Sequence, residues 1–321
     1  MQRVLIIQTA FLGDVILATP VVSEMKRLYP NCSIDVLVRK GNESILANHP
    51  DIHEVLTFNK KNGKWKEMLR LVSVLRSRKY DELINLQRFG SSGIISCLSK
   101  AKVKIGFNKN PFSFAYTRKI LHEIGNGKHE VERNLACIAH HGASSKIRPS
   151  VYPSNFDVEA VTSYLTSTFF VCAPASVWFT KQLPEHKWVE LINSLKQSGN
   201  VFLIGGPTDF ELCQRICEKA ELSESNNLAG KLTLLQSCAL MQKAKRCFVN
   251  DSGPQHMASA VNAPVTTFFC STVPAFGFGP LSDDSEIKEI SEPLYCRPCG
   301  LHGYKACPEK HFKCSMIDVN H

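Results

Sequence analysis

Short apolar runs alternate with helix-period patterns along the first half of the chain. Val4-Leu5-Ile6-Ile7 is a continuous apolar run of strand length, and a helical pattern begins at Gly13-Asp14 and continues to Leu28. Further strands are predicted over 34–38 and 83–86, with a helix over 65–78 between them. Because buried apolar strands alternate with amphipathic helices, the pattern predicts a parallel α/β architecture.

The alternation stops in a turn-rich stretch and then begins again. Residues 142–156 are rich in Gly, Ser and Pro, which is typical of an interdomain linker. Beyond it, strands are predicted over 169–172, 201–204 and 247–250, and helices over 187–196, 209–220 and 234–244. A chain of 321 residues is long enough for two cores. We therefore expect two doubly wound domains, 1–152 and 153–321, with ligands beyond the carboxyl ends of the strands.

The basic charge of the protein belongs to its first half. Residues 1–150 hold 24 Lys and Arg against 12 Asp and Glu, whereas the remainder holds 14 against 17. A one-sided positive field attracts anionic partners such as nucleic acid, lipid headgroups or acidic sugars, although most of these side chains are expected on solvated helix faces. The N-terminal apolar stretch contains Asp14 and lacks a small-residue cleavage site, so it predicts a strand and a cytoplasmic protein whose basic half can touch a membrane.

The strongest candidate site is the segment Asn250-Asp251-Ser252-Gly253-Pro254-Gln255-His256. A strand is predicted to end at Asn250, and a helix to begin with Pro254 in its first turn. Backbone N–H groups of Ser252 and Gly253, together with the positive end of the helix dipole, would form a phosphate cradle. The alternative is that Asp251 or Ser252 only caps the helix.

Two further segments follow predicted strands of the second half. Thr180-Lys181 offers a hydroxyl and an ammonium group to a second phosphate, the alternative being a surface lysine beside a core tryptophan. Glu211 follows the glycine-rich turn Gly205-Gly206-Pro207 and would accept a hydrogen bond from a ribose hydroxyl, although taken alone this segment favours an ordinary turn with a capped helix.

Asp14 is the candidate base of the first half. It follows the first predicted strand in Phe11-Leu12-Gly13-Asp14, where a carboxylate can take the proton of an attacking hydroxyl. An N-cap is again the competing interpretation.

Taken together and in this order, these segments resemble glycosyltransferase family 9, the ADP-heptose:lipopolysaccharide heptosyltransferases, over nearly the whole chain. The resemblance is specific at Gly13-Asp14-Val15, Thr180-Lys181 and Asp251-Ser252-Gly253-Pro254, and it extends to His129-Glu130-Val131-Glu132-Arg133 before the linker.

The resemblance implies a GT-B fold, with two Rossmann-like domains facing a central cleft. It implies an N-terminal acceptor-binding domain, a C-terminal nucleotide-sugar-binding domain with a Cys-rich tail, and inverting heptose transfer from ADP-heptose to the lipid A-Kdo inner core of lipopolysaccharide. No cofactor or catalytic metal is implied. Carried over residue by residue, it gives the following roles: Asp14 as catalytic base; Thr180, Lys181, Glu211, Asp251, Ser252, Gly253 and His256 for the donor; Gly13, Arg88 and Arg133 for the acidic acceptor.

Some features depart from the family pattern or suggest other functions. Cys172-Ala173-Pro174-Ala175-Ser176 and Gln182-Leu183 differ from the usual residues beside the donor site, so another nucleotide sugar is an alternative.

Cys296, Cys299, Cys307 and Cys314 are candidate zinc ligands, but reduced structural cysteines or disulfides are also consistent with their spacing. With the basic half, they raise a zinc-containing nucleic-acid-binding protein as a rival; no recognition motif supports it, and we expect no nucleic-acid partner. No G-x-G-x-x-G follows the first strand, which argues against a dinucleotide-dependent oxidoreductase.

Overall fold

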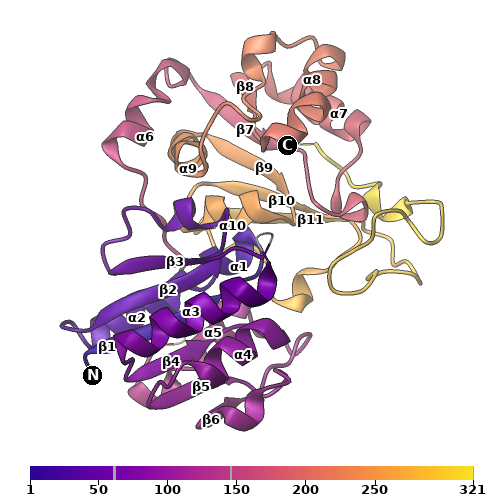
Figure 1. The fold of residues 1–321 in the computed structure, drawn as a ribbon. Coiled ribbons are helices and arrows are strands. Elements are labelled where there is room, and N and C mark those ends of the chain that lie inside the picture. The colour runs from indigo at the N-terminus through magenta and orange to yellow at the C-terminus, as the bar shows by residue number, and fades with distance from the viewer. Residues whose placement is uncertain (61–62, 145–146, 321) are drawn as a thin grey trace. The chain divides into compact units, whose positions relative to one another are not determined.

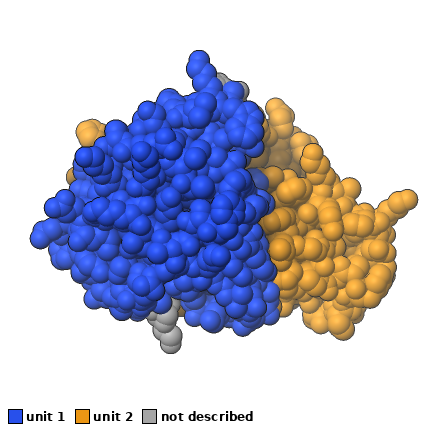
Figure 2. All heavy atoms as spheres, turned by 60° about the horizontal axis from the view of Figure 1, so that its bottom comes forward, with its two compact units in different colours: residues 1–152 blue, residues 153–321 orange. Residues whose placement is uncertain are grey.

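The computed structural model describes residues 1–60, 63–144 and 147–320 and divides the chain into two compact units. Unit 1 is Met1–Tyr152 and unit 2 is Pro153–His321, coloured separately in Figure 2. Ser145 and Lys146, in the turn-rich stretch, lie outside the described residues. None of the helices in the described ranges has both the length and the apolar character needed to span a lipid bilayer.

Unit 1 is built on a six-stranded sheet in the order β3-β2-β1-β4-β5-β6, in which every pairing is parallel. Its strands are β1 (Arg3–Gln8), β2 (Ser33–Arg39), β3 (Glu54–Phe58), β4 (Glu82–Asn85), β5 (Val103–Phe107) and β6 (Arg118–Ile120). Its helices are α1 (Leu12–Ile16), α2 (Thr19–Leu28), α3 (Lys64–Arg78), α4 (Gly90–Leu98) and α5 (Glu130–Ala136). The strand order reverses between β1 and β4, which is the topological switch point of a Rossmann sheet.

The core of unit 1 explains why β1 has four consecutive apolar residues, Val4 to Ile7. Leu5 and Ile7 belong to the buried cluster that includes Met68, Leu71 and Leu75 of α3. Figure 1 shows the helix α3 lying across the strands of this sheet. The alternate residues Val4 and Ile6 are also fully buried. A parallel strand covered on both faces needs apolar side chains in both directions.

The single helix predicted from Gly13 to Leu28 is wrong in one respect. The structure has two helices there, α1 ending at Ile16 and α2 beginning at Thr19. Pro20 lies in the first turn of α2, where its missing N–H costs no helical hydrogen bond. The proline therefore begins a new helix and does not continue the first.

Unit 2 contains a five-stranded sheet in the order β11-β10-β9-β7-β8, and its pairings are also parallel. Its strands are β7 (Phe169–Ala173), β8 (Asn200–Leu203), β9 (Arg246–Asn250), β10 (Val265–Phe269) and β11 (Ser285–Glu289). Its helices are α6 (Asn155–Glu159), α7 (Glu185–Leu195), α8 (Phe210–Lys219), α9 (Leu234–Lys243) and α10 (Gly253–Ala260). Counted along the unit, this is the order of a flavodoxin-like sheet, whose switch point lies between β7 and β9.

One face of the unit 2 sheet is covered by α7, α8 and the end of the chain. Trp188 and Ile216 belong to the same buried cluster as Phe170 and Phe248 of the strands. Ile317 and Val319 join this cluster, so the segment 314–319 packs into the core of unit 2.

Candidate functional site

The predicted donor residues gather at the switch point of unit 2. Lys181 ends a short 3₁₀ helix, Phe179–Lys181, in the loop after β7, and Asp251 comes directly after β9. These strands are hydrogen-bonded neighbours, and the carboxyl ends of neighbouring parallel strands meet at one edge of a sheet. Ligands of doubly wound folds bind at this place.

A buried ion pair joins these two loops. Lys181 Nζ lies 2.7 Å from Asp251 Oδ2, and their side chains are only 14% and 7% exposed. Thr272, after β10, donates a hydrogen bond of 2.6 Å from Oγ1 to the same carboxylate oxygen. Lys181 is therefore not the surface lysine of the alternative interpretation; its ammonium group is held in place by a carboxylate that is itself held.

The first turn of α10 lies beside this pair in the sequence. Ser252 is the N-cap residue with extended backbone angles, but its side chain makes no capping hydrogen bond. Its hydroxyl instead donates to the Asn250 carbonyl oxygen. Pro254 occupies the first turn, and Gln255 and His256 are buried. The N-terminus of α10 thus lacks the side-chain cap that the competing interpretation requires.

Thr180 has a different position from the one expected. Its side chain is buried, and its Oγ1 accepts a 2.8 Å hydrogen bond from the Tyr304 N–H and lies 3.0 Å from Ser271 Oγ. This placement argues against the direct phosphate contact predicted from sequence. The hydroxyl instead ties the loop after β7 to the loop after β10 and to the C-terminal segment.

The C-terminal segment supports the donor edge through Arg297, which the sequence analysis missed. Its guanidinium group donates to the carbonyl oxygens of Phe269, Cys270 and Thr272 at 2.7–3.0 Å. Charge-assisted hydrogen bonds of this kind are stronger than neutral ones. Arg297 therefore holds the chain around Thr272, whose hydroxyl in turn holds Asp251. The sequence signal available for this role was an arginine placed between Cys296 and Pro298.

Gly303 shows how closely this segment approaches the site. Its φ of +74° is a left-handed conformation, and a Cβ atom there would lie 2.8 Å from Thr180 Oγ1 and 3.1 Å from Lys181 Cγ. Glycine is required on both grounds.

The four clustered cysteines do not form a compact ligand set. All thirteen cysteines of the chain are free thiols. Within the described ranges, no three of Cys296, Cys299, Cys307 and Cys314 bring their sulfur atoms within 4.8 Å of one another. Cys314 is buried in the unit 2 core, where burial raises the pKa of its thiol to about 12.

Glu211 lies in the first turn of α8, after the glycine-rich turn that follows β8. Its side chain is exposed, whereas the nearby Asp209 carboxylate accepts a 2.7 Å hydrogen bond from the Gly206 N–H. The turn is therefore fixed by Asp209, and the ribose contact of Glu211 stays a prediction.

In unit 1, Asp14 and Arg88 come together at the switch point between β1 and β4. Gly13 and Asp14 lie in α1 after β1, and Arg88 follows β4. The Asp14 carboxylate caps α1 by accepting a 3.2 Å hydrogen bond from the Phe11 N–H. Burial raises the pKa of Asp14 to about 6, and the charge of Glu130 adds to this, while the Phe11 N–H and Arg88 oppose it.

Glu130 is a second residue whose part the sequence analysis missed. It is buried, with Arg133 Nε at 2.7 Å and His122 Nε2 at 3.3 Å from its carboxylate. Burial pushes the pKa of Glu130 upward, but His122 and Arg133 outweigh it and the net pKa is lowered. Arg133 is itself buried, and it also donates to the Lys128 carbonyl oxygen. Its place argues against direct contact with an acceptor and favours a part in holding Glu130 near Asp14.

Comparison with known proteins agrees with this geometry. The model of glycosyltransferase family 9 (heptosyltransferase) matches residues 68–306. A lipopolysaccharide heptosyltransferase 3 of Escherichia coli is 30% identical over 277 residues, which are 82% of each chain.

Solved structures show the same fold. The ADP-heptose LPS heptosyltransferase II of E. coli superposes with a TM-score of 0.78 at 21% identity, covering 98% of this chain and 97% of that one. E. coli heptosyltransferase WaaC with ADP-2-deoxy-2-fluoro heptose gives 0.71 at 22% identity, covering 89% and 92%. These likenesses confirm the expected GT-B fold. By the family model and the 30% identical relative together, the chain belongs to glycosyltransferase family 9, the heptosyltransferase family, and is a glycosyl-transferring enzyme.

Proposed function

We propose that the protein transfers heptose from ADP-heptose to the inner core of lipopolysaccharide, with inversion at the anomeric carbon. In this proposal unit 2 binds the donor and unit 1 binds the acceptor. The names of its relatives support the reaction class, since they are lipopolysaccharide heptosyltransferases, and the WaaC structure contains an ADP-heptose analogue.

The observation that carries the proposal is the buried pair of Lys181 and Asp251 at the switch point of unit 2. Lys181 provides the positive charge that a diphosphate requires, and the N-terminus of α10 provides backbone N–H groups. When the bond to the sugar breaks, negative charge grows on the diphosphate. Preorganised donors at this place stabilise that charge without a metal ion.

Asp251 is assigned to the sugar side of the donor. A carboxylate repels phosphate oxygens, but its lone pairs accept hydrogen bonds from sugar hydroxyl groups. The hydrogen bond from Thr272 and the ion pair with Lys181 fix its orientation, and both use Oδ2. Oδ1 is then the atom that faces a hydroxyl group in the proposed complex.

Asp14 is assigned as the base. As the acceptor oxygen attacks the anomeric carbon, its proton passes to the Asp14 carboxylate, the new carbon–oxygen bond forms, and the old bond to the diphosphate breaks with its electron pair. ADP leaves, and the single displacement inverts the configuration. A carboxylate with a pKa of about 6 is a better proton acceptor than an ordinary aspartate and is still ionised at neutral pH.

The positive charge of unit 1 suits an acidic acceptor. Arg88 is half-buried next to Asp14, where it can meet a carboxylate or phosphate of the acceptor. The excess of Lys and Arg in residues 1–150 would also favour transient contact with the anionic surface of the inner membrane on its cytoplasmic face.

Donor choice tests the proposal as a whole. Incubated with a heptose-deficient lipopolysaccharide acceptor and a panel of nucleotide sugars, the protein should release ADP from ADP-heptose and little UDP or GDP from other donors. Release from another nucleotide sugar alone would favour the alternative family-9 transferase. Residues 172–176 and 182–183, which depart from the family pattern beside the donor site, would account for that outcome.

Replacing Lys181 tests the donor site. Lys181→Ala should weaken ADP binding about 10- to 100-fold, because a hydrogen bond between charged groups contributes about 1.5–3 kcal/mol. Isothermal titration calorimetry measures this directly. Lys243→Ala, an exposed lysine at the end of α9, is the matched control. Equal ADP affinity in the Lys181 variant would remove it from the phosphate site.

Replacing Asp14 separates chemistry from binding. Asp14→Asn keeps an oxygen for the Phe11 N–H but cannot accept the proton, so kcat should fall about 10²- to 10⁴-fold while the Kd for ADP stays nearly the same. Asp81→Asn, at the residue before β4, should leave turnover intact. Unchanged turnover in the Asp14 variant would exclude it as the base.

The pH profile gives a second test of the base. Because the ionised form is active, kcat/KM should be constant above the pKa of Asp14 and fall as the pH drops through about 6. Arg88 lowers this pKa, so Arg88→Gln should move the acid limb to higher pH. An acid limb that does not move in this variant would contradict the assignment.

A further inference from the structure

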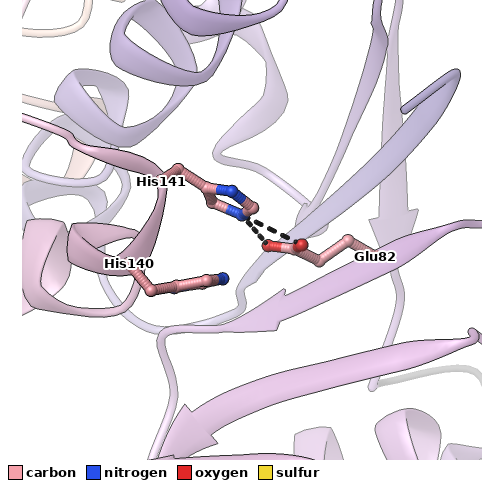
Figure 3. A group of neighbouring side chains, drawn as sticks. All are labelled: Glu82, His140 and His141. Carbon is pink, nitrogen blue, oxygen red and sulfur yellow. Dashed lines mark hydrogen bonds and ion pairs between the residues drawn. The ribbon is translucent and has the colours of Figure 1, made fainter.

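Two imidazole rings and a buried carboxylate converge at the opposite end of the unit 1 sheet from Asp14. Glu82 is the first residue of β4 and is 5% exposed. His140 and His141 belong to the 3₁₀ helix Ala139–His141, which follows α5 and ends at Gly142 with a positive φ. Each of the three side chains has a potential ligand atom within 4.8 Å of the other two. Figure 3 shows both rings reaching from this turn toward the Glu82 carboxylate.

His141 is already oriented as a metal ligand would be. Its Nε2 lies 3.1 Å from both carboxylate oxygens of Glu82, and its Nδ1 lies 2.8 Å from the hydroxyl of Tyr29. A histidine ligand usually has its second ring nitrogen hydrogen-bonded in this way, which sets the tautomer and the ring orientation. Tyr29, the residue after α2, performs that part here.

The distances suit a small divalent ion. Two ligand atoms bound to one zinc ion at the tetrahedral angle lie about 3.3 Å apart, given bonds of about 2.0 Å. The 3.1 Å separation between His141 Nε2 and Glu82 is already close to this value. The ring of His140 lies 3.9 Å from that of His141, centroid to centroid, and is exposed, so it can turn to complete the set.

The charge at this place also favours a cation. A buried carboxylate needs a positive partner, and a histidine supplies a full charge only when it is protonated. A divalent ion would neutralise Glu82 and be bound by both rings in their neutral form.

A second group, Asp35, His53 and Glu54, does not offer the same opportunity. Arg78 lies 2.9 Å from Asp35 and 2.7 Å from Glu54, and Arg3 lies 3.4 Å from Asp35. Two guanidinium groups already neutralise these carboxylates, so no vacancy for a cation is expected there.

We propose that Glu82, His140 and His141 bind one zinc-class divalent ion, with water as the fourth ligand. Two imidazoles and one carboxylate are a ligand set that zinc accepts with a position left for water. The site lies at the amino ends of the strands, away from the switch point, so its role is structural: it fastens the turn at 139–141 to the sheet. The inference does not depend on the transferase proposal.

The test is zinc binding to the full chain. Cys296→Ser/Cys299→Ser serves as the parent, so that tail thiols do not compete for the ion. After treatment with a chelator and its removal, titration with zinc chloride should give one equivalent, and bound zinc should raise the Tm by about 5 °C at a hundredfold excess over the Kd. Cobalt in the same site should lack thiolate charge-transfer bands.

Single substitutions in this parent identify the ligands. His140→Ala removes an exposed side chain and should keep the fold, yet lose zinc affinity by at least about 100-fold along with the Tm shift. Glu82→Gln should do the same, and Tyr29→Phe should weaken binding about 10-fold. His53→Ala, in the second group, should bind as the parent does. A parent that binds no zinc, or a His140 variant that binds it equally well, would overturn the proposal.

Discussion

The arrangement of unit 2 depends on one buried ion pair, Lys181 with Asp251. Removing one partner of such a pair leaves an uncompensated charge and costs about 3–5 kcal/mol. The protein keeps both charges in place by adding hydrogen bonds around them: Thr272 donates to Asp251, and Arg297 holds the backbone on which Thr272 lies. A charged group held in this way is already ordered before a diphosphate binds. Binding therefore costs less conformational entropy.

The sheets of the two units differ in strand order, but their candidate functional residues lie at equivalent places. Unit 1 has Rossmann strand order and unit 2 has flavodoxin-like order, yet in each the functional candidates lie where the order reverses. Asp14 and Arg88 follow β1 and β4; Lys181 and Asp251 follow β7 and β9. Because parallel strands end at a common edge, residues far apart in sequence meet there without any long-range signal in the chain. The topology therefore explains why short motifs after strands carry the function.

Strands and site residues were predicted from the sequence where the local pattern of apolar residues or the motif was strong. Strands such as β1 and β9 were predicted because they contain continuous apolar runs, Val4 to Ile7 and Cys247 to Val249, whereas β3, β6 and β11 were missed because they are partly exposed and carry polar residues. Strands β5 and β10 were also missed, although β10 is fully buried. That Lys181 and Asp251 lie in loops at the carboxyl ends of strands followed from the strand-end rule, whereas Arg88 entered only through the family resemblance, and its place near Asp14 comes from the structure. The parts of Arg297 and Glu130 did not follow from the strand-end rule either, since each acts through contacts across 8 to 28 residues that no periodicity records. For Thr180 and Arg133 the motif was recognised from the sequence, but the structure buries both side chains. Thr180 contacts Tyr304 and Ser271, and Arg133 contacts Glu130 and Lys128.

A crystal structure of the protein with bound ADP would test the central claim most directly. The account predicts diphosphate oxygen atoms within hydrogen-bonding distance of Lys181 Nζ and of the backbone N–H groups at the start of α10, with Asp251 turned toward the place of the sugar. ADP bound elsewhere on unit 2, with Lys181 and Asp251 still paired and remote from its phosphates, would contradict it.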